Sequence, residues 1–123
     1  MKSLFLLLAG TLFAGEPSSY SGQWKNLTNG DKGTLTVTAT LMEDQTWKTT
    51  FVGKLDEKPF DYEIIMKVVK DTNLMIPSPL KLEGRISAGG DSFTLYVNMD
   101  EKTLNGQFIS PSSNGEFRLT RME

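Results

Sequence analysis

A strict alternation between residues 34 and 41 constrains the fold of this chain more than any other feature. Threonine occupies every even position of the stretch, and an apolar residue, Leu35, Val37, Ala39 or Leu41, occupies every odd one. A period of two built on β-branched residues predicts a β-strand with one buried face and one solvated face. The stretch therefore predicts that at least this part of the chain belongs to a β-sheet.

The same period continues along the chain, and turn residues interrupt it at short intervals. An opening strand lies within residues 20–30, and further strands are expected at 46–54, 60–69, 80–87, 92–99, 103–110 and 116–121. Residues 70–79 form a longer connection, in which Pro77 and Pro79 oppose regular hydrogen bonding. About eight strands in sequence, with no helical periodicity, predict an antiparallel meander.

A meander of this strand number removes its exposed edges by closing on itself. We therefore predict an all-β fold, a single antiparallel up-and-down barrel of about eight strands spanning residues 16–123, with an open sandwich as the alternative. The length of 123 residues fits one domain with one modest core.

Residues 1–15 have the pattern of a secretory signal peptide. Lys2 precedes an apolar run from Leu4 to Ala9, and small residues follow at Ala14 and Gly15. Cleavage after Ala14 and cleavage after Gly15 both remain open. The run is much shorter than the ~20 residues of a spanning helix, so we expect no stable membrane anchor after processing and a secreted or periplasmic protein.

The absence of cysteine and histidine narrows the chemistry. With neither residue present, the chain lacks the usual nucleophilic triads, zinc ligands and haem or iron–sulfur ligands, and we expect no enzyme activity, metal or cofactor. A formal charge of −2 gives no excess of basic residues of the kind that binds nucleic acid. Asp61 and Glu63 leave a carboxylate hydrolase as a remote alternative, but we expect them on the outer face, in weak charge pairs with the following strand.

Gly22, Trp24 and Asn26 of the first strand, with the arginine-containing last strand 117–121, resemble the avidin-like and wider calycin barrels, the group that includes the lipocalins. In that group the first-strand Trp closes one end of the barrel and packs against an Arg of the last strand. Strand parity selects Arg121 as the inward-facing candidate. The resemblance thus implies barrel closure by a Trp24–Arg121 contact.

The avidin ligand site carries over only in part. Asn26 matches the Asn that contacts the ureido oxygen of biotin, but Gly30 stands at the nearest position of the following Ser. Phe51, four residues after Trp47, replaces the third-strand Tyr and lacks its hydroxyl. Because a site without its hydrogen-bonding groups rejects a polar ligand, the resemblance does not imply biotin binding.

The expected inner face is almost wholly apolar. Bulky residues at so many inward positions favour a filled core, whereas the functional interpretation is a pocket with Asn26, Thr49 and Tyr62 as polar groups and Phe51 in its wall. The leading hypothesis is a non-enzymatic barrel that binds a small apolar or amphipathic ligand at its mouth. The alternative is a filled barrel that serves as a structural or protein-interaction module.

A partner interface would require an apolar patch on the outside of the barrel. Several apolar residues fall on the expected outer face and would mark a homo-oligomer or partner interface if they cluster: Val52, Ile65, Val69, Tyr96 and Ile109.

Overall fold

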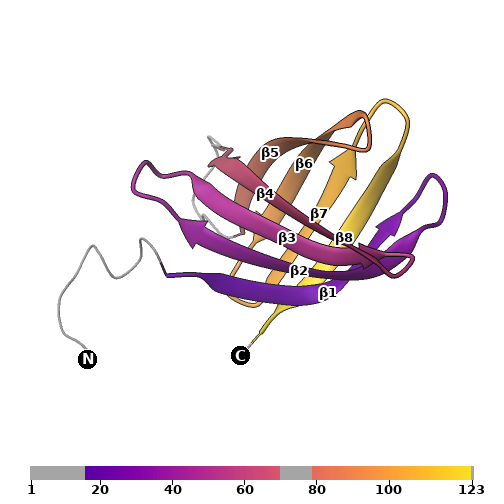
Figure 1. Cartoon of the computed structure of the whole chain (residues 1–123). Helices are drawn as coiled ribbons and strands as arrows, with labels where there is room; N and C mark the ends of the chain where they lie inside the picture. The colour runs from indigo at the N-terminus through magenta and orange to yellow at the C-terminus, as the bar shows by residue number, and fades with distance from the viewer. Residues whose placement is uncertain (1–15, 70–78, 123) are drawn as a thin grey trace.

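The computed structural model describes residues 16–69 and 79–122, and their strands form one closed antiparallel barrel (Figure 1). Each strand pairs with the next, and the last pairs with the first. This closure confirms the predicted barrel and excludes the open sandwich. The strands are β1 (Ser18–Asn26), β2 (Lys32–Leu41), β3 (Trp47–Leu55), β4 (Lys58–Val68), β5 (Leu80–Ala88), β6 (Asp91–Met99), β7 (Thr103–Ile109) and β8 (Asn114–Arg121).

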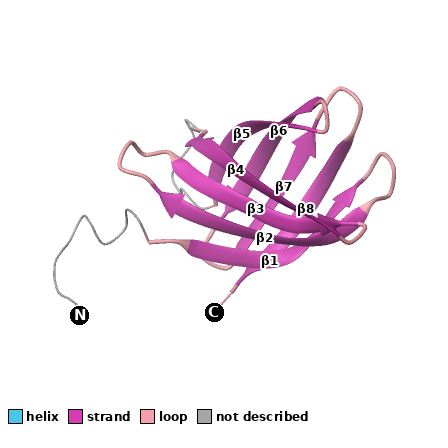
Figure 2. Ribbon diagram, in the orientation of Figure 1, coloured by secondary structure: helices cyan, strands magenta, loops and turns pink. Residues whose placement is uncertain are grey.

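The described chain consists of strands and loops (Figure 2). Within residues 16–69 and 79–122, no helix has the length and apolar character to cross a membrane. The proposed signal segment, residues 1–15, lies outside the described residues. The alternation that predicted β2 is confirmed, since Leu35, Val37 and Ala39 are buried and the intervening threonines are not.

The two ends of the barrel differ in their connections. The end that we call the mouth carries the short loops β1–β2, β3–β4, β5–β6 and β7–β8, whereas β1 begins and β8 ends at the opposite end, the terminal end. In the β5–β6 loop Gly89 and Gly90 have φ values of 59° and 85°, as a type I′ hairpin requires. In the β3–β4 loop the same left-handed region is occupied by Asp56 and Glu57.

The half of the barrel next to the terminal end is filled. Val37 and Met66 are fully buried, and Leu82 and Leu104 are each 1% exposed. Aliphatic side chains from the facing strands thus meet on the barrel axis, at the close packing of a protein core.

Tyr20 closes this filled half at the terminal end. The phenol is buried, and its hydroxyl donates to the backbone carbonyl of Asp100 in the β6–β7 loop at 2.7 Å. Burial raises the pKa of Tyr20, although the charge of Arg121 acts in the opposite direction. The Asp100 carboxylate accepts the N–H groups of Lys102 and Thr103, which lowers the pKa of Asp100.

One seam of the barrel is incomplete. Among the described residues, β4 pairs with β5 at Lys67–Glu83 and Val68–Leu82, next to the terminal end. By contrast, β3 and β4 pair along their whole length. The strands β4 and β5 therefore separate toward the mouth, as Figure 1 shows.

Candidate functional site

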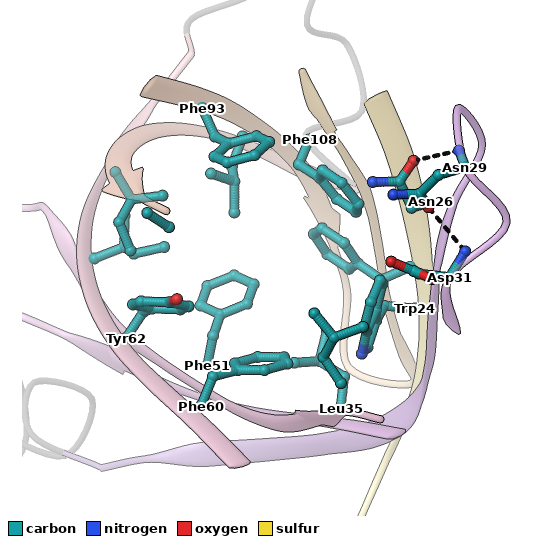
Figure 3. Close-up of a pocket in the computed structure, with 16 residues that line it drawn as sticks. Trp24, Asn26, Asn29, Asp31, Leu35, Phe51, Phe60, Tyr62, Phe93 and Phe108 are labelled. Carbon is teal, nitrogen blue, oxygen red and sulfur yellow. Dashed lines mark hydrogen bonds between the residues drawn. The ribbon is translucent and has the colours of Figure 1, made fainter. Parts of the chain in front are cut away.

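The half of the barrel next to the mouth is hollow and contains a cavity of about 290 Å³. All eight strands contribute to its wall, and Figure 3 shows their side chains arranged around an open centre. The lining residues are Trp24, Asn26, Asn29, Asp31, Leu35, Phe51, Leu55, Phe60, Tyr62, Ile64, Ile86, Ala88, Phe93, Leu95, Phe108 and Phe117.

Five aromatic rings form a continuous arc around the cavity, which we call the aromatic arc: Tyr62, Phe60, Trp24, Phe108 and Phe93. Tyr62 stacks on Phe60 with ring centres 5.6 Å apart. Trp24 makes edge contacts with Phe60 at 6.2 Å and with Phe108 at 6.4 Å. Phe93 completes the arc by an edge contact with Phe108 at 5.8 Å. Each ring is therefore held by at least one other, in the offset or edge geometries that aromatic pairs prefer.

The floor of the cavity separates it from the filled half. Phe51 of β3 and Phe117 of β8 meet there edge to face at 5.7 Å, and both are buried. Leu35, Ile64 and Leu95 surround this pair. The cavity is consequently open toward the mouth and closed below by packed apolar side chains.

The cavity exists because large rings lie opposite glycines on the neighbouring strand. A Cβ atom at Gly53 would lie 2.6 Å from Cζ of Phe60, and one at Gly33 would lie 2.8 Å from Nε1 of Trp24. Each ring thus covers its glycine and lies against the wall instead of crossing the lumen. Four pairs share this contact between ring and glycine: Trp24 with Gly33, Phe60 with Gly53, Phe108 with Gly115, and Phe117 with Gly106. Phe117 differs from the other three rings because it reaches into the lumen and forms the floor with Phe51.

Trp24 does not contact Arg121, so that expectation is wrong. In the β1–β8 register Arg121 lies opposite Tyr20, whereas Trp24 lies opposite Phe117. Four residues of strand separate the two levels, which is about 13 Å at ~3.3 Å per residue. Arg121 shares the parity of the inward residues Phe117 and Leu119, but its side chain is exposed at the terminal end, where Nη1 donates to the carbonyl of Glu101 at 3.5 Å. The Trp24 indole N–H instead donates to the backbone carbonyl of Lys54 at 3.1 Å.

Asn26 lies at the rim, where its side chain organises the β1–β2 loop. Its Oδ1 accepts the backbone N–H of Thr28 at 2.8 Å and that of Asn29 at 3.1 Å. Asn29 in turn accepts the backbone N–H of Asp31 at 2.9 Å (Figure 3). The oxygen that the avidin comparison assigned to a ligand contact is therefore engaged by the loop.

The other predicted pocket residues are divided between the cavity and the core. Phe51 and Tyr62 line the cavity, as Asn26 does. Thr49 does not, because it lies deeper, is 1% exposed, and donates its hydroxyl to the carbonyl of Ile64 at 2.7 Å. Asp31 lines the cavity but was not among the predicted residues. Counting back from the inward-facing Leu35 in steps of two, through Gly33, leads to Asp31, so the alternation would have identified this residue.

The carboxylates Asp61 and Glu63 are exposed on the outer face, outside the cavity. Glu63 lies 3.6 Å from the Lys48 ammonium of β3. The predicted weak cross-strand charge pair therefore forms for Glu63, but with the preceding strand β3, because the described β4–β5 pairing does not extend to this level. In the described part of the chain no three acidic side chains gather as metal ligands would.

The outer apolar residues are separated by polar ones. Val52 lies between Thr36 and Asp61 in the strand register, and Ile65 lies opposite Lys48. Tyr96 is likewise flanked by Glu83 and Gln107, and Ile109 by Thr94 and Asn114. No two of these four hydrophobic residues lie directly opposite each other, and only Tyr96 and Ile109 are diagonal neighbours, on β6 and β7. Together they form no extended apolar patch.

Comparison of the chain with protein-family models, with curated proteins and with solved structures finds no match. The closed eight-stranded antiparallel barrel agrees in general with a calycin-like architecture.

Proposed function

We propose that this protein is a non-enzymatic, extracytoplasmic binding protein that holds a small apolar or amphipathic molecule in the cavity at the mouth of its barrel. The observation that carries the proposal is the aromatic arc around a cavity of about 290 Å³. Concave sites lined mainly by apolar and aromatic groups, with a few polar groups at the rim, are typical of small-molecule binding.

The cavity volume sets the ligand size. A cavity of ~150 Å³ lined by apolar side chains accepts benzene, so about 290 Å³ accommodates roughly two fused aromatic rings or an alkyl chain of similar volume. The separation of β4 from β5 leaves Tyr62 and Ile86 on either side of an unpaired seam.

The filled-barrel alternative has weaker support. Its packed core is present in one half of the barrel, but its outer apolar residues are interrupted by polar neighbours. Within the calycin comparison, the strand topology and the first-strand Trp24 support a lipocalin-like binding barrel. The Arg121 position does not support it, and the engaged oxygen of Asn26 gives no support to an avidin-like biotin site.

Two tryptophans, one toward each end of the barrel, provide the test. Trp24 lines the cavity, whereas Trp47 begins β3 near the terminal end. We expect titration with 2-naphthylmethanol or 1-decanol to shift the indole N–H signal of Trp24 in a ¹H–¹⁵N NMR spectrum and to leave that of Trp47 in place. The variant Trp47→Phe assigns the two signals. For a ligand of this size we expect a Kd of about 0.1 mM.

A cavity-filling variant supplies the control. Ile86→Trp places a ring in the cavity and should abolish the shift, whereas Ile65→Trp adds the same ring on the outer face and should not. Unchanged Trp24 signals with both probes would contradict the proposal. Equal loss of binding in the two variants would show that the probes bind elsewhere.

A further inference from the structure

The rim of the cavity carries one kind of charge. Among the described residues that line the cavity, Asp31 is the one with an acidic side chain, and none is Lys or Arg. The amide groups of Asn26 and Asn29 are neutral and hold the loop through their oxygens. Any discrimination by ligand charge at this rim therefore depends on Asp31.

The Asp31 side chain is directed toward the cavity and takes no part in the loop structure. Gly33 and Leu35 continue its parity on the inner face of β2, and Figure 3 shows the carboxylate on the cavity side of the loop, near Trp24. The loop uses only its backbone, since its N–H donates to Asn29 and its carbonyl accepts from Asn26 at 2.6 Å.

Nothing in the described chain neutralises this carboxylate. Across residues 16–69 and 79–122, the Asp31 carboxylate forms no ion pair with a Lys or Arg side chain. The nearest cationic residues along the chain are Lys25 and Lys32. They lie opposite each other in the β1–β2 register, on the outer face of the barrel.

The aromatic arc attracts the same kind of charge. The faces of Trp, Tyr and Phe rings carry negative electrostatic potential and stabilise an ammonium group within about 6 Å of the ring centre. Trp24 belongs both to the arc and to the part of the wall nearest Asp31. A cation at the rim would thus meet a carboxylate on one side and ring faces on the other, whereas an anionic ligand would meet repulsion from both.

We propose that the ligand is a cationic amphiphile: an apolar, ring-sized body inside the aromatic arc and an alkylammonium group at the rim beside Asp31. This inference rests on the proposed binding function and specifies its ligand class. It separates amines from fatty acids and other carboxylates, which an apolar cavity alone would accept equally.

Three probes with the same body test the charge preference: 2-naphthylmethylamine, 2-naphthylmethanol and 2-naphthoate, each titrated by calorimetry into the full protein at pH 7. We expect the amine to bind about fivefold to tenfold more tightly than the alcohol, and the carboxylate more weakly than both. The variant Asp31→Asn should reduce the difference between amine and alcohol to less than about twofold.

Asp61→Asn is the matched control, because it removes the same charge from the exposed outer face of β4. In this variant, the logarithm of the ratio between the Kd of the alcohol and the Kd of the amine should keep at least half of its wild-type value. The backbone hydrogen bonds of Asp31 remain available to asparagine, so the variant is expected to fold, and its thermal unfolding midpoint checks this.

The outcomes separate the two proposals. If the alcohol binds but the amine has no advantage, or keeps its advantage in Asp31→Asn, the charge inference is wrong and the binding function stands. If none of the three probes binds, both are wrong.

Discussion

The two halves of this barrel are built from the same eight strands yet contain different interiors. Next to the terminal end, inward aliphatic residues such as Val37, Met66 and Leu82 meet on the axis and fill it. Next to the mouth, the rings of Trp24, Phe60 and Phe108 lie over glycines on the neighbouring strand and leave the axis open. The comparison shows that the size of inward side chains does not by itself determine whether a barrel is filled. What lies opposite each side chain matters as much.

A matched pair of truncations on one strand tests this difference most directly. Leu82 and Ile86 lie on the same face of β5, one in the filled half and one lining the cavity. Leu82→Ala should lower the free energy of unfolding by about 2–5 kcal/mol, because it opens a void in packed surroundings. Ile86→Ala should cost only ~1 kcal/mol, since it enlarges a space that already exists. Urea unfolding measures both, and equal costs would contradict the division into halves.

Loss of a glycine should disturb the hollow half. A Cβ at Gly115 would lie 2.6 Å from Cε1 of Phe108 and closer still to the backbone carbonyl oxygen of Lys25, so Gly115→Ala must displace both the ring and the neighbouring backbone. We expect a loss of about 1–3 kcal/mol in the free energy of unfolding, together with weaker binding of 2-naphthylmethanol. In a Phe108→Ala background the same substitution should cost at least ~0.5 kcal/mol less. Additive costs would show that the ring is not what the glycine accommodates.

Tyr20 tests the closure of the filled half. Tyr20→Phe removes the hydrogen bond to the Asp100 carbonyl and should cost ~1 kcal/mol of unfolding free energy. It should leave binding of the neutral probe unchanged, because Tyr20 is not among the residues lining the cavity. A variant that weakened probe binding as well would show that the two halves are coupled.

The same residue predicts a pH dependence. Burial raises the pKa of Tyr20 in the folded state, so the native protein retains this proton to higher pH than the unfolded chain does. The contribution of Tyr20 to the free energy of unfolding is therefore fully present below the pKa of about 10 in the unfolded chain. This contribution is lost as the pH rises through the pKa of Tyr20 in the folded state. Between pH 8 and 11 the stability of the wild type should fall more steeply than that of Tyr20→Phe. Parallel curves would contradict this assignment.

The smallest expected effects concern two hairpins at the mouth. Glu57 has a φ of 68° in the β3–β4 turn, where glycine is favoured, and Gly90 has a φ of 85° in the β5–β6 turn. Glu57→Gly should raise the free energy of unfolding by about 0.5–1 kcal/mol, whereas Gly90→Ala should lower it by ~1 kcal/mol. Opposite signs in thermal unfolding are the expected result. Equal signs would show that turn geometry does not control stability at this end.

The sequence was sufficient to predict the strands, but not to predict which residues meet inside the barrel. Alternation reports which face of a strand is buried, so β2 and the meander could be read directly from it. The same parity predicted Arg121 on the inner face, but its side chain is exposed at the terminal end. Its level relative to Trp24 depended on the β1–β8 register, which joins the two ends of the chain and has no local signal.

The candidate site was predictable in the same partial way. Phe51, Tyr62 and Asn26 were identified as pocket residues because they sit at inward or rim positions. Thr49 shares that parity, but its depth along the barrel axis, set by pairing with β4, places it in the core. Asp31 was missed because it precedes the obvious alternation.

By itself, the sequence determined the strand periodicity, the antiparallel meander and the apolar character of the inner face. These are consequences of local patterning, which each strand carries within its own residues. Only the tertiary structure decided that one half of the barrel is filled and the other hollow. That outcome depends on which residues face each other across strands, and pairs such as Phe108 with Gly115 form only when the barrel closes in one register.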